Sequence, residues 1–177
     1  FYGLFAAGLQ RTLRFKAGLD VTREQCEEII RNLKAGYPGL ARWQEREKHT
    51  VRNTCYAQTW LGRRRYLYGI LSQDWGKRSF AERCALNTPI QGTAADILKL
   101  ACGRIVGSLP LLPWLKPLLQ IHDELVFEVP RDRVEDAVKF IKACMETQPF
   151  PGFDVPIVAE AAAGPNFGEL EELEVLS

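Results

Sequence analysis

Residues 118–129 read LLQIHDELVFEV, and this stretch decides how the second half of the chain folds. Two apolar runs of strand-forming residues flank the cluster His122-Asp123-Glu124, which predicts a β-hairpin with acidic residues at its tip. Adjacent carboxylates on a rigid tip are costly unless a cation or a partner stabilises them. Taken alone, the stretch is equally compatible with an ordinary solvated turn between two strands.

The composition is that of a globular protein of 177 residues, 46% hydrophobic and 25% charged, long enough for one core or two small subdomains. No apolar run reaches the ~20 residues that span a membrane, and no secretory signal pattern opens the chain, so we expect no membrane partner. The five cysteines are odd in number, widely spaced and without a C-x-x-C pair. This usage argues against a disulfide framework or a zinc site and indicates reduced thiols in the cytosol.

The net charge of +1 hides an asymmetry along the chain. Residues 1–83 carry 16 Lys and Arg against 8 Asp and Glu, whereas residues 84–177 carry 7 against 14. A basic half suits a phosphate backbone, and an acidic half suits divalent cations. Accidental clustering of charge along solvated helices is the alternative.

Periodicity and breaker residues predict helices over about 9–15, 21–33 and 40–53, then a strand over 56–61. A long helix is predicted over 80–108, and Pro89 inside it should kink or break it. After the hairpin, a helix over 131–146 and a strand over 156–162 complete the chain. We therefore expect an α+β fold.

A second motif lies upstream, where residues 82–96 read ERCALNTPIQGTAAD, and a third is LGRRRYL at 61–67. Together with the hairpin, in this order, they resemble the family A DNA polymerases, the group of bacterial DNA polymerase I and its phage relatives. The resemblance runs from Phe1 to about Leu170. It implies the C-terminal part of the fingers over residues 1–78, and the second half of the palm, with an antiparallel sheet and a long helix, over residues 79–177.

The resemblance implies a template-directed polymerase that adds deoxynucleotides to a primer 3′-hydroxyl in DNA replication and repair, using two Mg²⁺ ions held by carboxylates. It assigns Asp123 and Glu124 as catalytic metal ligands, and His122 as a catalytic residue at the primer terminus. Gln120, on the same hairpin, is assigned to nucleic-acid binding. For Glu124, simple solvation is the alternative. One carboxylate ligand, from the first palm motif, is missing, so we expect the fragment alone to be inactive.

Arg83, Asn87 and Gln91 are spaced four apart, which keeps them on one face of a helix. Three neutral or basic donors in a row suit the minor groove, where every base pair offers an acceptor. The resemblance implies that they touch the primer–template just behind the active site. A solvated polar stripe is the alternative.

Arg63 and Arg64, in the GRRR turn at 62–65, are predicted to contact phosphates, with solvated charge as the alternative. Tyr2 would match the family tyrosine that stacks near the templating base, with core packing as the alternative. Residues 67–69 read LYG and depart from the family, in which a proline often follows the leucine. We therefore expect the following loop to run differently.

The partners implied are primer–template DNA, deoxynucleoside triphosphates and the remainder of the polymerase chain, in the cytoplasm of a bacterial or phage-infected cell, at the nucleoid. Because the sequence begins at Phe1 and not at a methionine, we expect a piece of a longer polypeptide. Two alternatives to the polymerase function are a catalytically silent DNA-binding module and a remnant with only a packing role. Asp123 argues against both, because a silent module has no reason to keep an acid at a hairpin tip.

Overall fold

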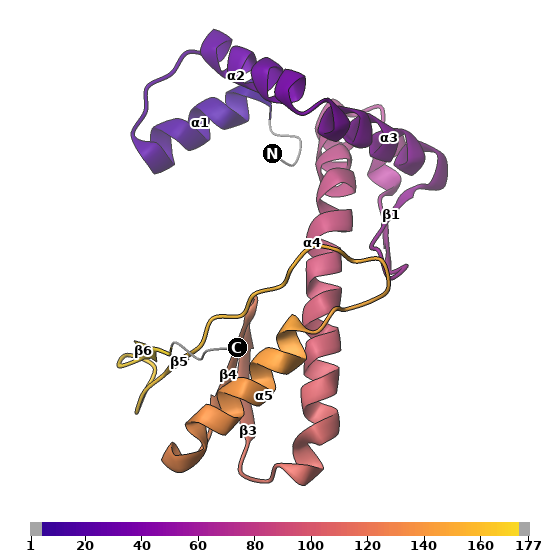
Figure 1. The fold of residues 1–177 in the computed structure, drawn as a ribbon. Helices are drawn as coiled ribbons and strands as arrows, with labels where there is room; N and C mark the ends of the chain where they lie inside the picture. The colour runs from indigo at the N-terminus through magenta and orange to yellow at the C-terminus, as the bar shows by residue number, and fades with distance from the viewer. Residues whose placement is uncertain (1–4, 174–177) are drawn as a thin grey trace. The chain divides into compact units, whose positions relative to one another are not determined.

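The computed structural model describes residues 5–173, and the chain divides into two compact units, Phe1–Thr93 and Ala94–Ser177. Helices and short antiparallel sheets share the chain, so the predicted α+β class is confirmed. Figure 1 shows the long helix α4 (Trp75–Ser108), whose residues belong partly to each unit. Each unit has its own apolar cluster.

The first unit begins with the helices α1 (Ala6–Ala17), α2 (Arg23–Gly36) and α3 (Pro38–Thr54). Thr22 caps α2: its side chain accepts a hydrogen bond from the backbone N–H of Gln25, whose side chain accepts from the N–H of Thr22. Pro38 stands at the start of α3, where its missing N–H costs nothing. These local signals explain why the three predicted helices form close to their predicted positions.

A small hairpin follows α3 and consists of β1 (Tyr56–Gln58) and β2 (Arg64–Tyr66), after which comes the 3₁₀ helix η1 (Tyr68–Leu71). The predicted strand over 56–61 therefore ends early, because the chain turns after Gln58. The cluster that supports this hairpin combines α3, β1, η1 and the first half of α4. Its buried members are Val51, Ala57, Leu67, Ile70, Ala81, Cys84 and Ala85.

Helix α4 continues through Pro89, so the break, one of the two outcomes predicted there, does not occur. Proline removes one N–H from the ladder. Side-chain hydroxyls add bonds to nearby carbonyls: Thr88 donates to the carbonyl of Cys84 at 2.7 Å, and Thr93 donates to that of Pro89. One bond lies within the turn that precedes the proline and the other within the turn that begins at it, so both turns gain a side-chain hydrogen bond.

The second unit contains the end of α4, the 3₁₀ helix η2 (Leu109–Leu111) and the strands β3 (Lys116–Ile121) and β4 (Glu124–Glu128). The short η3 (Arg131–Arg133) leads into α5 (Val134–Glu146). Apolar side chains from α4, β4 and α5 form its cluster around Ile105, Leu115 and Ala137. The Arg104 guanidinium on α4 donates to the carbonyl of Cys144, at 2.9 Å, near the end of α5.

A strand was predicted over 156–162, but only β5 (Ala162–Ala163) forms there, paired with β6 (Glu171–Glu172). The prediction is wrong for residues 156–161, because Pro156 has no N–H and the N–H of Ala159 donates to the Glu146 carboxylate at 2.8 Å. Residues 156 and 159 therefore have no backbone N–H available for hydrogen bonds to a neighbouring strand.

Candidate functional site

The acid-bearing hairpin forms as the sequence predicts. Strands β3 and β4 are antiparallel, and Ile121 pairs with Glu124, which leaves His122 and Asp123 as a two-residue turn. His122 has a φ of 54°, in the left-handed region that few residues other than glycine adopt. The Gln120 side chain donates to the carbonyl of His122 at 2.7 Å and supports this conformation. Backbone strain of this kind is typical of functional turns.

The side chains of His122, Asp123 and Glu124 are all exposed at this tip. Within residues 5–173, neither the Asp123 nor the Glu124 carboxylate makes a hydrogen bond or an ion pair, and both side chains are exposed to water. Carboxylate oxygens are the ligands that Mg²⁺ prefers. The same described residues contain no group of three or more His, Cys, Asp or Glu that could hold a metal ion. The tip therefore presents two adjacent, exposed carboxylates, which is the ligand chemistry that part of a magnesium site requires.

An ion pair joins the two strands of the hairpin at the end opposite the turn. Lys116 and Glu128 are partner residues, and Lys116 Nζ lies 2.7 Å from Glu128 Oε1. This hydrogen bond to Glu128 raises the pKa of Lys116 above its ordinary value. On the inner side, Leu125 and Phe127 pack against the apolar cluster of the second unit. The strands that lead to the tip are thus held by the Lys116–Glu128 ion pair and by packing against the apolar cluster.

Arg83, Asn87 and Gln91 lie on α4, all within the first unit. The Arg83 guanidinium donates to the Ser79 hydroxyl at 2.7 Å and lies 6.0 Å from the centre of the Phe80 ring. The Asn87 amide donates to the Gln91 side-chain oxygen at 3.1 Å. These contacts hold the three side chains, which we call the donor stripe, and Gln91 is exposed.

The GRRR turn is anchored to α4. The Arg63 guanidinium donates to the carbonyl of Gly92 at 2.9 Å, and the backbone N–H of Arg63 donates to the Thr59 hydroxyl at 3.1 Å. The Arg64 guanidinium lies over the Tyr56 ring, 4.5 Å from its centre. Arg63 therefore has a structural contact beside Gln91, which the sequence prediction of a phosphate contact did not include.

Gly92 and Thr59 are the residues that sequence reasoning missed. A Cβ atom at Gly92 would lie 2.6 Å from the Thr59 methyl carbon, so only glycine lets the turn approach α4 this closely. The Thr93 hydroxyl adds a second link by accepting from the N–H of Trp60 at 3.0 Å. The run of small residues at 92–95 signals close packing, but the partner is distant in sequence and no local pattern reveals it.

The structure thus brings the predicted residues together in two groups. Arg63, Arg64 and the donor stripe share the first unit, whereas Gln120, His122, Asp123 and Glu124 share the second. Tyr2 lies outside the described residues. Across the described part of the chain, no helix combines the length and the apolar character needed to cross a membrane.

Comparison with known proteins gives a consistent match. The sequence model for DNA polymerase family A matches residues 1–169. The thermostable DNA polymerase I of Thermus filiformis is 38% identical over 176 residues, covering 97% of this chain and 19% of the relative. DNA polymerase I of Bacillus subtilis is 34% identical over 167 residues, covering 94% of this chain and 18% of the relative. The chain thus spans about a fifth of the length of these curated relatives.

Among solved structures, the POL domain of Pol1 from M. smegmatis, in complex with DNA primer-template and dNTP, has a TM-score of 0.77 with this chain. It is 33% identical, and the match covers 88% of this chain and 26% of the solved one.

Proposed function

This chain belongs to DNA polymerase family A, and we propose that it forms part of a template-directed DNA polymerase. The proposed reaction is the addition of deoxynucleotides to a primer 3′-hydroxyl by two-metal nucleotidyl transfer, in DNA replication and repair. The observation that carries the proposal is the strained, acid-bearing turn at His122-Asp123, in a chain matched to this family over residues 1–169. The subdomains proposed are fingers over residues 1–78 and palm over residues 79–177.

The acid tip would hold magnesium. Bound Mg²⁺ would supply the positive charge that stabilises the in-line displacement at the phosphorus. Asp123 and Glu124 fit the ligand role because their carboxylates are exposed, adjacent in sequence and carried on a fixed hairpin. His122, at the first position of the turn, would lie against the primer terminus. The remaining carboxylate ligand would come from the remainder of the polymerase chain.

The donor stripe would contact the primer–template through its minor groove. The stripe presents guanidinium and amide donors, and the acceptors in the minor groove occur at every base pair. Its members are already held by contacts to Ser79 and to each other, so little side-chain freedom is lost on binding. Arg64, in the GRRR turn, would add a phosphate contact.

The remainder of the polymerase chain is a proposed partner of the second unit. An open hollow of about 240 Å³ lies between the end of α4 and the hairpin, lined mostly by apolar side chains such as Ile105, Leu118 and Phe127. Leu118 and Leu119 on β3 are more than half exposed. Apolar surface of this kind is typical of an interface with a further protein segment. The proposed location is the cytoplasm of a bacterial or phage-infected cell, at the nucleoid.

We expect this chain alone to bind duplex DNA weakly and to lack polymerase activity, because positioning and charge neutralisation both need further ligands. The test is primer extension by the purified chain with labelled primer–template, all four deoxynucleoside triphosphates and Mg²⁺, with duplex binding measured in parallel. The expected result is salt-sensitive binding without extension.

Two results would contradict parts of this proposal. Extension that disappears in Asp123→Ala would show that a second acid within this chain completes the site. Absence of duplex binding even at low salt would favour the alternative that this chain is a remnant with only a packing role. A silent DNA-binding module is distinguished in the full-length protein, where it would bind duplex and never extend it.

A further inference from the structure

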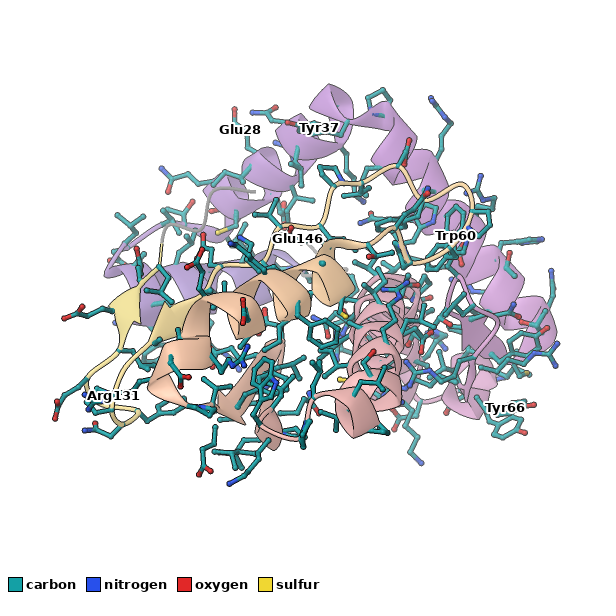
Figure 2. The ribbon with its side chains drawn as sticks, turned by 60° about the horizontal axis from the view of Figure 1, so that its bottom comes forward. Glu28, Tyr37, Trp60, Tyr66, Arg131 and Glu146 are labelled. Carbon is teal, nitrogen blue, oxygen red and sulfur yellow. The ribbon has the colours of Figure 1, made fainter. Side chains whose placement is uncertain are left out.

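Two tyrosine rings lie side by side on the surface of the first unit. Tyr66, the last residue of β2, and Tyr68, the first residue of η1, have ring centres 5.8 Å apart and ring planes 17° from parallel. Their exposed fractions are 57% and 71%. In Figure 2 the Tyr66 ring points away from the ribbon. The pair is therefore a stacked aromatic surface that remains open to solvent.

The backbone explains why the two rings share a face. Leu67, between them, is buried in the cluster of the first unit, and its N–H donates to the carbonyl of Cys55 at 2.7 Å. With the middle side chain turned inward, residues 66 and 68 turn outward together. Tyr56, the partner of Tyr66 in the β1–β2 hairpin, packs edge-on against it at 5.9 Å and fixes its position.

Positive charge lies close to the pair. Residues 56–73 contain the three arginines of the GRRR turn and no acidic residue. The Arg64 guanidinium lies over the Tyr56 ring, and Arg64 and Arg65 are both exposed. Exposed aromatic faces next to cations match the chemistry of an unpaired nucleic-acid strand, since bases stack on the rings and phosphates meet the cations.

We propose that Tyr66 and Tyr68 form a platform on which a base of single-stranded DNA stacks, with Arg64, on the same face of β2 as Tyr66, beside the adjoining phosphates. Duplex DNA cannot use the rings in this way, because neighbouring base pairs already cover the faces of its bases. The inference rests on the proposed function, in that the unpaired template strand ahead of a primer is the single strand such an enzyme holds.

The test uses the purified 177-residue chain with a labelled oligothymidylate and with a blunt duplex, and measures binding by fluorescence anisotropy. Tyr68→Leu should weaken oligothymidylate binding about tenfold, because it removes one base–aromatic stack, and should change duplex binding less than about twofold. Tyr68→Phe keeps the ring and should bind normally. Tyr37→Leu is the matched control, since Tyr37 is also 63% exposed but lies between α2 and α3.

A second readout does not depend on any variant. An oligothymidylate carrying one 2-aminopurine should change its fluorescence when the unaltered chain saturates it, because the base stacks on an aromatic ring. Absence of that fluorescence change would overturn the platform. So would a Tyr68→Leu variant whose oligothymidylate affinity stays within twofold of the unaltered chain, or one that loses equal affinity for single strand and duplex. Failure of the proposed function would instead appear as a duplex affinity that does not change when residues of the donor stripe are substituted.

Discussion

Two regions of the molecule differ in how many contacts within this chain hold their side chains. One is the GRRR turn together with the donor stripe, and the other is the acid tip, residues 122–124 of the β3–β4 hairpin. Arg63 is held by Gly92 and Thr59, and Asn87 is held by Gln91. The tip presents Asp123 and Glu124 to water, and its turn is supported by a side-chain bond from Gln120. Under the proposed function, the first region is a prearranged DNA-binding surface, whereas the second supplies part of a metal site. Binding and catalysis should therefore be separable by substitution.

The largest effect is expected at the tip. In the full-length polymerase, Asp123→Ala should reduce primer extension by about 10³-fold or more, because a metal ligand is worth several kcal/mol in the transition state. Duplex affinity should stay within about twofold. Single-turnover extension and anisotropy measure the two quantities separately. The matched control is Asp132→Ala, an exposed acid in η3 that lies outside the tip. Extension within tenfold of the unaltered enzyme would exclude Asp123 as a metal ligand.

Gly92→Ala tests whether the binding surface depends on the close approach of the GRRR turn to α4. The added methyl group collides with the Thr59 side chain and should destabilise the first unit by about 1–3 kcal/mol, with weaker duplex binding. Gly103→Ala, on the same helix with open space around it, should instead stabilise the chain by about 0.5–1 kcal/mol. Chemical denaturation measures both, and equal effects at the two glycines would show that the approach is unimportant.

These positions show what the sequence could and could not predict. The hairpin was predictable, because apolar runs of strand-forming residues lie on both sides of the cluster His122-Asp123-Glu124. The continuity of α4 through Pro89 and the contact of Gly92 with Thr59 were not, because both depend on atoms that a local pattern does not contain. The strand predicted over 156–162 is absent over 156–161 for the same reason, since a carboxylate 13 residues away accepts the N–H of Ala159.

The donor stripe should show a smaller, sequence-independent effect. Asn87→Ala removes both a donor to the groove and the support of Gln91, and should weaken duplex binding by about 1.5 kcal/mol. Arg83→Ala should do the same and also reduce the salt dependence. Arg31→Ala, an exposed arginine on α2, controls for charge alone. Duplexes of different base composition should respond equally, and a strong dependence on one base pair would mean that the helix reads sequence.

The smallest effect concerns Cys144 in the second unit, whose burial raises the pKa of its thiol above the ordinary value of 9.0, with Arg104 opposing the shift. The folded chain therefore keeps this proton at pH values where the unfolded chain has released it. The resulting stabilisation is complete below about pH 9 and declines as the pH rises through the raised pKa. Thermal unfolding between about pH 8 and 11 should show a steeper loss of stability in the unaltered chain than in Cys144→Ala. Parallel curves would mean that the thiol is as accessible as in the unfolded chain, and the packing of α5 against the apolar cluster of the second unit would need revision.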